Sequence, residues 1–323
     1  MAVEQQARKL TCGYCQGEND IPPFARVVTC EFCGSPNELQ SGKVIENHHM
    51  LSVYFSGSRL QELIPQYLSK YMGVPGNFSD KAVFTKFDLE MMPFWLFKFH
   101  GKTDYRGIGK YCSPQHSGVW SRSINISTRP ERGNIDLDQT CLVFGYKEQH
   151  KQIRDEKIPA GAKEAFNISA VNNEGGKIYD TEISYEEAHR IAEEQVRAKH
   201  NQLIFREIVK MDGANQDIQL KEMSYLHVPF YKVKYNYGKW TGEALVDASR
   251  GKVLRAEYPI SRAHRFWGLF FILIAICAIG AAIYFIIGLP QWKIAGYVAA
   301  VIFAGVLIFG IKESVTKKKV AAE

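Results

Sequence analysis

Two long apolar stretches near the C-terminal end constrain this chain more than any other feature. They run over Phe266–Ile287 and Ile294–Ile311, and only the segment Gly288–Lys293 joins them. A helix needs about 20 apolar residues to cross the roughly 30 Å hydrocarbon layer of a bilayer, and so short a link leaves room for a turn alone. The sequence therefore predicts an antiparallel transmembrane helical hairpin, in which each helix satisfies its own backbone polar groups.

The charges around the two stretches predict how such a hairpin is oriented. Nine Lys and Arg residues flank it, whereas Lys293 alone lies in the turn, and the positive-inside rule then places both termini in the cytoplasm. The opening Met1–Gln6 lacks the apolar core of a secretory signal. We therefore expect a multi-pass protein of the cytoplasmic (plasma) membrane with both termini cytoplasmic. The cations could contact anionic lipid headgroups or could be topology signals alone; they are Arg250, Lys252, Arg255, Arg262, Arg265, Lys312, Lys317, Lys318 and Lys319.

Four cysteines near the N-terminal end form the strongest local motif. Cys12 and Cys15 make one Cys-x-x-Cys turn, and Cys30 and Cys33 make a second one fourteen residues later. Each turn directs two thiolates at one spot, and together they supply the tetrahedral four-sulfur set that Zn²⁺ prefers. The sequence therefore predicts that these four residues bind a structural Zn²⁺ in a zinc ribbon that folds only with its metal.

Three other chemistries fit these cysteines less well. Disulfides are rare in the reducing cytoplasm expected here, and a thioredoxin-like redox site needs one Cys-x-x-Cys opening a helix after a strand. A catalytic zinc keeps one position open for water, whereas four cysteines close the shell. The role of the ribbon stays open, since such ribbons bind nucleic acid, bind proteins or cap a larger domain. The scattered Cys112, Cys141 and Cys277 are expected to be buried, inert thiols.

The middle of the chain contains an internal repeat. The segment Met92–Phe99 is echoed 136 residues later by Val228–Tyr235. An amphipathic helical pattern precedes each copy, over residues 60–68 and 188–196. Ser184, with a Glu three residues later, forms a capping box at the start of the second helix. After each copy the residues alternate between apolar and polar, as in a strand with one buried face.

These elements together predict an α+β fold. A zinc ribbon occupies residues 1–45 and is followed by two tandem helix-plus-antiparallel-sheet modules, over 46–146 and 147–262. The transmembrane hairpin and its basic tail complete the chain over 263–323. Within the second module, Asp247–Gly251 is expected to form the turn of a hairpin.

The aromatic residues that alternate with lysine after Pro229 allow two interpretations. Tyr231, Tyr235 and Tyr237 could stack on the bases of a nucleic acid, with the intervening lysines on its phosphates. They could instead form the buried side of a sheet whose other side is solvated, and the strict alternation favours this second interpretation.

The catalytic motifs that a sequence can reveal are missing. We find no phosphate-binding Gly-x-x-x-x-Gly-Lys-Ser/Thr, no His-Glu-x-x-His and no Gly-x-Ser-x-Gly. His48 and His49 are the one adjacent histidine pair, and successive side chains of a strand point to opposite faces, which disfavours a shared metal. The leading interpretation is therefore that the chain is not an enzyme. A hydrolase or transferase built from scattered residues would need a deep polar pocket.

The order of these elements resembles that of a known group. The cysteine quartet, Pro93-Phe94-Trp95, Pro229-Phe230-Tyr231, the turn within 246–253 and the closing hairpin together resemble the prokaryotic TFIIB-type zinc-ribbon membrane proteins. Some members of that group are similar to anchors in bacterial envelope-stress systems, which recruit phage-shock-type coat proteins or flotillin-like SPFH proteins. The resemblance implies a comparable role in membrane stress or membrane organisation.

The sequence thus favours a non-enzymatic membrane-anchored adaptor or complex subunit that presents its zinc ribbon to cytoplasmic partners. The expected partners are the membrane, through two helices, and a second protein or another copy of this chain. Small residues spaced by four, at Gly296, Ala300 and Ala304, fit packing within the hairpin or against such a subunit. The alternative is a membrane-tethered zinc-ribbon protein that binds nucleic acid. The leading interpretation does not expect a nucleic-acid partner.

Overall fold

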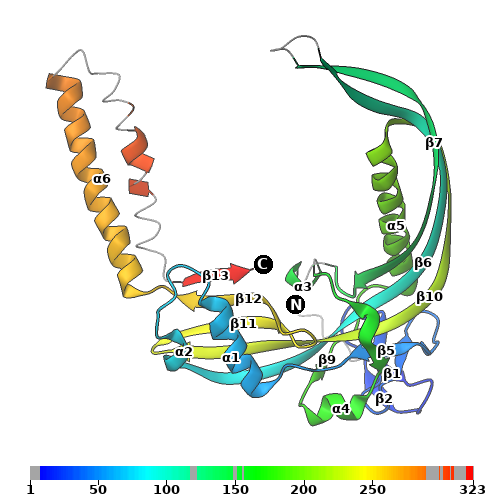
Figure 1. Cartoon of the computed structure of the whole chain (residues 1–323). Coiled ribbons are helices and arrows are strands. Elements are labelled where there is room, and N and C mark those ends of the chain that lie inside the picture. Colours follow the sequence, from blue (N-terminus) through cyan, green and yellow to red (C-terminus); the bar gives the residue numbers. More distant parts are fainter. Residues whose placement is uncertain are drawn as a thin grey trace, which may run out of the picture. The chain divides into compact units, whose positions relative to one another are not determined.

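The computed structural model describes residues 8–116, 122–147, 151–154, 156–288, 298, 301–305, 307–308 and 318–322. The chain divides into two compact units (Figure 1). Unit 1 comprises Met1–Ser52 and Glu90–Pro229, and unit 2 comprises Val53–Leu89 and Phe230–Glu323. Strands make up 47% of the fold and helices 28%.

Unit 1 begins with two small antiparallel hairpins that form the ribbon. β1 (Lys9–Thr11) pairs with β2 (Glu18–Asp20), and β3 (Val27–Thr29) pairs with β4 (Pro36–Glu38). β5 (His48–Leu51) then pairs in parallel with β10 and antiparallel with β8. The remaining elements of this unit, with the two strands that it shares with unit 2, are β6 (Ala82–His116), β7 (Arg122–Phe144), α3 (Lys151–Arg154), η1 (Ala160–Ala162), β8 (Lys163–Ala165), α4 (Ile168–Asn173), β9 (Lys177–Ile178), α5 (Tyr185–Glu207) and β10 (Ile208–Tyr237).

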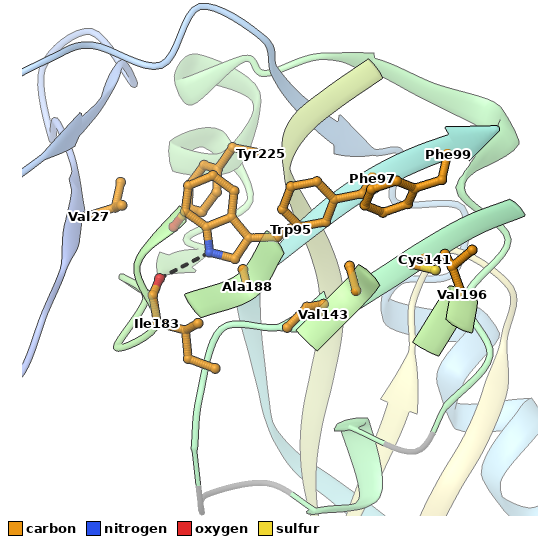
Figure 2. Packing of buried hydrophobic residues seen from close by; sticks show 11 residues of the cluster. Val27, Trp95, Phe97, Phe99, Cys141, Val143, Ile183, Ala188, Val196 and Tyr225 are labelled. Atoms are coloured by element: carbon orange, nitrogen blue, oxygen red, sulfur yellow. Dashed lines mark hydrogen bonds between the residues drawn. The ribbon is translucent and has the colours of Figure 1, made fainter. Parts of the chain in front are cut away.

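The core of unit 1 surrounds Trp95, which projects from β6 (Figure 2). Its indole N–H donates to the backbone oxygen of Ile183 at 3.1 Å. α5 lies along β7 (Figure 1), and its small residues Ala188 and Ala192 bring the helix close to the sheet. The eleven buried residues of this cluster come from β3, β6, β7, α5, β10 and the segment before α5; they are Val27, Trp95, Phe97, Phe99, Cys141, Val143, Ile183, Ala188, Ala192, Val196 and Tyr225.

Unit 2 is an antiparallel meander with helices beside it. The last part of β10, residues 230–237, pairs with β11 (Trp240–Asp247), β11 with β12 (Lys252–Pro259), and β12 with β13 (Lys318–Ala322). The predicted turn is confirmed, because the N–H of Gly251 donates to the oxygen of Asp247 at 2.8 Å and Gly251 has a φ of 69°. The further elements of this unit are α1 (Gly57–Leu68), α2 (Phe78–Lys81), β11 (Trp240–Asp247), β12 (Lys252–Pro259), α6 (Arg262–Gly288) and β13 (Lys318–Ala322).

The predicted α+β fold with two tandem modules is wrong. The two copies of the repeat lie in β6 and β10, and these strands pair with each other in one nine-stranded sheet. β6 and β10 are also far longer than the strands expected for a small module. Their exposed parts, like that of β7, continue the strand pairing of the sheet. The amphipathic helices were predicted correctly as α1 and α5, and Ser184 is the N-cap of α5, accepting from the N–H of Glu187 at 3.3 Å.

The predicted transmembrane hairpin is wrong as well. In the part of the chain that the structure describes, no helix combines the length and the apolarity that a bilayer crossing requires. α6 covers Phe266–Ile287, whereas Ile294–Ile311 lies largely outside the described residues, as do Gly296 and Ala300. The location predicted from this hairpin, a multi-pass protein of the plasma membrane with both termini cytoplasmic, is therefore wrong too.

Some of the cations assigned to that hairpin take part in the sheet of unit 2 instead. Arg250 Nη2 lies 2.6 Å from Asp247 Oδ2, and Arg255 Nη2 lies 3.1 Å from Glu257 Oε1. Lys318 and Lys319 belong to β13 and pair with β12. Their positions follow from ion pairs and strand pairing within the unit.

Candidate metal centre

The two Cys-x-x-Cys turns have the same backbone structure. In each, the first cysteine donates its N–H to the oxygen five residues later, from Cys12 to Gly17 and from Cys30 to Ser35, at 2.9 Å in both. The residue four places after that cysteine, Gln16 or Gly34, donates back to its oxygen. Both of these residues have a positive φ, which Gly34 adopts without strain. The ribbon therefore contains two Cys-x-x-Cys turns of equivalent backbone structure, which we call the first and second knuckle.

The four thiols converge as the spacing predicted. Their sulfur atoms all lie within 4.8 Å of one another. Cys12 Sγ is 3.7 Å from Cys33 Sγ, and Cys15 Sγ is 3.6 Å from Cys30 Sγ. Four sulfurs at 2.3 Å from a tetrahedral ion are separated by about 3.8 Å, whereas a disulfide is about 2.05 Å long. Cys12, Cys15, Cys30 and Cys33 thus form a cluster that could hold a metal ion.

Two asparagines cross-link the knuckles, and sequence reasoning missed them. Asn19 lies in the first hairpin and reaches the second knuckle, where its amide donates to Cys30 Sγ at 3.4 Å and accepts from the N–H of Glu31 at 2.8 Å. Asn37 does the reverse: its amide donates to Cys12 Sγ at 3.5 Å and accepts from the N–H of Gly13 at 2.9 Å. Both side chains are buried. Such supporting hydrogen bonds orient metal ligands and raise affinity.

A repeat in the sequence would have revealed this pair. Each asparagine follows the first cysteine of its own knuckle by seven residues, so that Cys-x-x-Cys-x-x-x-Asn occurs twice at an offset of eighteen residues. Only the structure shows that each asparagine hydrogen-bonds to the knuckle of the other hairpin. Each knuckle therefore has one cysteine sulfur that accepts from the asparagine of the other hairpin.

The hydrogen bonds at the knuckles shift the pKa values of Cys12 and Cys15 in opposite directions. Burial opposes ionisation of Cys12, but the N–H groups of Cys15 and Tyr14 and the amide of Asn37 together lower its pKa to about 6. At Cys15 the N–H of Gly17 favours the thiolate, yet burial and the hydrogen bonds from Cys33, Cys30 and Cys12 raise the pKa to about 12. A cation bound by Cys12, Cys15, Cys30 and Cys33 would favour the thiolate form of all four.

The second hairpin of the ribbon is built into unit 1. Val27 of β3 is fully buried in the Trp95 cluster. The N–H of Arg26 donates to the oxygen of Thr181 at 2.7 Å, and the N–H of Thr29 donates to Asp180 Oδ1 at 2.8 Å. Burial raises the pKa of the Asp180 carboxyl to about 7, although the Thr29 N–H opposes this shift. The cysteine cluster and the apolar core are therefore joined through β3.

The ribbon exposes large apolar side chains at its knuckles. Tyr14 and Phe32 occupy the variable positions of the two Cys-x-x-Cys turns and are 75% and 64% exposed. Phe24, between the hairpins, is 81% exposed and has a φ of 69°, a conformation that bulky residues rarely adopt. These three rings are available for binding.

Comparison with known proteins finds no match to a family model, a curated protein or a solved structure. The resemblance to TFIIB-type zinc-ribbon proteins therefore stays a prediction. The interpretation of the four cysteines as a possible metal site depends on their own geometry.

Other predicted features have mixed outcomes. Tyr231 and Tyr235 are buried on β10, so the interpretation of this strand as a sheet with one buried side is confirmed, and those rings are covered against stacking on bases. Cys141 is buried as expected, whereas Cys112 and Cys277 are exposed. His48 Nε2 lies 2.8 Å from His227 Nδ1, on strand β10.

The structure also contains a hollow of 340 Å³ in unit 1. Its lining includes Val143, Phe144 and Ile191, together with Lys147 and Glu187, which form an ion pair at 2.9 Å. The two charges neutralise each other. The prediction that the chain is not an enzyme stays a prediction.

Proposed function

We propose that the four cysteines hold a structural Zn²⁺ and that the chain is a non-enzymatic adaptor or complex subunit whose ribbon binds a protein partner. The observation that carries the metal assignment is the closed set of four sulfurs, with separations close to those of a tetrahedral zinc site. Four thiolates leave no coordination position for water or substrate, so the metal would act on folding.

The adaptor role is supported by the exposed rings at the knuckles. Tyr14 and Phe32 are held by turns that the metal itself fixes, so they are ordered before a partner arrives. Aromatic anchors that need no further ordering are the residues that most often dominate protein interfaces. The cysteines thus shape the binding face without contacting the partner.

The metal assignment is tested by native mass spectrometry of the full chain. One Zn²⁺ per chain is expected, and the Cys30→Ser variant should lose it. The matched control is Cys112→Ser, which removes a thiol outside the cluster and should keep the metal. A wild-type chain purified under reducing, zinc-containing conditions without bound metal would contradict the assignment.

The adaptor role is tested by affinity capture with a double variant, Tyr14→Ala with Phe32→Ala. A specific protein should be recovered with the wild-type chain and lost with the variant, while zinc content stays at one. Tyr54→Ala removes an exposed ring of unit 2 and should retain the partner. Recovery of the chain alone, or equal recovery with the double variant, would count against an adaptor.

A second candidate function uses the same rings. Tyr14, Phe24 and Phe32 could stack on the bases of a single-stranded nucleic acid. Binding of that kind falls steeply with salt because phosphate contacts release counterions. A titration of the full chain with single-stranded DNA and RNA at about 50 and 200 mM salt distinguishes it from protein binding, and no affinity at the lower concentration would end it.

A further inference from the structure

Two histidines far apart in the sequence meet inside unit 1. His48 lies on β5 and His227 on β10, and the parallel register pairs His48 with Tyr225 and His227 with Met50. The two rings are therefore diagonal neighbours on one face of the sheet. His48 Nε2 is 2.8 Å from His227 Nδ1, and His227 is fully buried.

The outer nitrogens of this pair both contact backbone oxygens. His48 Nδ1 lies 2.9 Å from the oxygen of Gly34, and His227 Nε2 lies 3.1 Å from the oxygen of Tyr179. A carbonyl oxygen accepts hydrogen bonds and donates none. Both outer nitrogens must therefore carry hydrogen for these two contacts to be hydrogen bonds.

The hydrogen count leaves the central contact incomplete. A neutral imidazole carries one N–H, so two neutral rings supply two hydrogens for three contacts. With both outer positions filled, two lone pairs face each other between His48 Nε2 and His227 Nδ1 at 2.8 Å. Any other choice of tautomers moves the gap to a carbonyl and does not remove it.

We propose that His48 and His227 form a proton-binding site that takes up one proton and shares it between His48 Nε2 and His227 Nδ1. The third hydrogen completes an unbroken chain from Gly34 through both rings to Tyr179. This chain connects the second knuckle, through the residue after Cys33, with the segment that precedes α5. Proton binding therefore tightens the attachment of the ribbon to the rest of unit 1.

The surroundings of the pair suit a delocalised positive charge. His48 stacks on Phe166 with ring centroids 4.0 Å apart and an interplanar angle of 16°. The Tyr225 ring lies 5.4 Å from His48 and 5.2 Å from His227. Aromatic faces attract cations, more strongly where water is excluded, and the two carbonyl oxygens at the ends of the chain add charge-assisted hydrogen bonds.

The distance favours a proton over a metal ion. Two nitrogens bound to one tetrahedral ion at 2.0–2.1 Å stand about 3.3 Å apart, whereas 2.8 Å is a hydrogen-bond length. The contact would have to open inside a packed interior to admit an ion. A proton fits without any such movement.

Burial sets the strength of the site. It lowers the pKa of His48 to about 2, with repulsion from a charged His227 as the next cause, and that of His227 to about 4. Neither ring alone would thus hold a second hydrogen at neutral pH. The pair as a unit binds its first proton more readily, because that proton completes a hydrogen bond, and repulsion bars the second.

Other titratable groups lie on the elements around the pair. They are His49 on β5, Tyr225 on β10, Tyr179 and Asp180 before α5, and Cys33 in the knuckle. His49 is the histidine next along the strand, and its side chain points to the opposite face. It therefore provides a matched control.

The site is tested by a pH titration of the full chain labelled with ¹⁵N in histidine and observed by NMR. Two imidazoles should titrate with one common midpoint and take up a single proton, with a strongly deshielded N–H between them. In His227→Phe the midpoint of His48 should fall by at least about one pH unit, a tenfold weaker proton affinity. His49→Phe should leave the common midpoint in place.

Three results would overturn the proposal. The two rings could titrate separately in the wild-type chain, or both could stay neutral down to the pH at which the chain unfolds. A second equivalent of Zn²⁺ that His227→Phe removes would assign a metal to the pair in place of the proton. The wild-type titration decides between the first two without any variant, so a folding defect in His227→Phe does not blunt the test.

Discussion

The ribbon and the Trp95 core adjoin within unit 1, yet different forces hold them. The ribbon has strands of three residues, and its buried groups are thiols and asparagine amides as much as apolar side chains. The Trp95 core gathers eleven buried side chains from elements more than a hundred residues apart. If the proposed metal binds, the small ribbon depends on metal–thiolate bonds because it buries little surface. The Trp95 core depends on apolar burial.

Removal of the metal should have the largest effect and should fall on the ribbon. Binding of structural Zn²⁺ is worth roughly 10–16 kcal/mol in small zinc modules, more than so small a sheet can supply otherwise. Chelation, or Cys30→Ser, should abolish amide-exchange protection in residues 8–45 and leave the protection of α5 and of β6 around Trp95 largely intact. Amide hydrogen exchange followed by mass spectrometry measures both regions in one experiment.

This experiment can also break the comparison. If α5 and β6 lose protection together with the ribbon, the metal holds the whole of unit 1 and the two regions are one cooperative unit. If the ribbon keeps its protection without metal, the cysteine cluster is not what folds it.

Truncation at the centre of the core should have the next largest effect. Trp95→Ala removes a fully buried ring and leaves the oxygen of Ile183 without its indole donor. Such substitutions cost about 3–5 kcal/mol. Urea unfolding should show this loss, while the affinity for Zn²⁺ should stay within about twofold of wild type. Tyr54→Ala, at an exposed ring, should change stability by less than about 0.5 kcal/mol.

Substitution of the asparagines should have the opposite effect to Trp95→Ala, because it should lower the affinity for metal more than the stability of the core. Asn37→Ala removes the donor to Cys12 Sγ and the acceptor for the Gly13 N–H. Loss of such supporting contacts weakens metal binding about 10–100-fold, or roughly 1.4–2.7 kcal/mol. Competition with a chromophoric chelator should show a similar loss for Asn19→Ala. Asn47→Ala, at an exposed amide outside the knuckles, should match wild type.

The two regions also differ in how far the sequence predicts them. The four ligands lie within 22 residues and follow a fixed spacing, so the cluster could be predicted, as could α1, the Ser184 cap of α5 and the turn at Gly251. Each of these signals is local. Chemistry that requires particular residues at short spacing leaves a pattern that can be read along the chain.

The features that the sequence did not predict depend on contacts between distant segments. The repeat at Pro93 and Pro229 suggested two modules, but β6 and β10 pair in one sheet, and strand pairing carries no signal in the spacing of residues. The outer parts of β6, β7 and β10 are mostly polar and were not recognised as strands. His48 and His227, 179 residues apart, meet only because β5 inserts beside β10.

The smallest predicted effect concerns the joint between the two regions. Asp180 accepts from the N–H of Thr29 in β3, and burial raises its pKa to about 7 from an ordinary value of 3.8. Between these values the folded chain holds a proton that the unfolded chain has released, so stability should fall as pH rises from about 4 to about 7.

Asp180→Asn keeps an oxygen for Thr29 and cannot ionise. The variant should therefore lack this slope and exceed wild type by about 1–2 kcal/mol at pH 7.5, and by a smaller margin at pH 5. Urea midpoints measured at both pH values check this, with Asp217→Asn at an exposed carboxylate as the control. Equal slopes for wild type and Asp180→Asn would show that the Asp180 carboxyl does not keep its proton in the folded chain over this pH range, and would contradict the raised pKa.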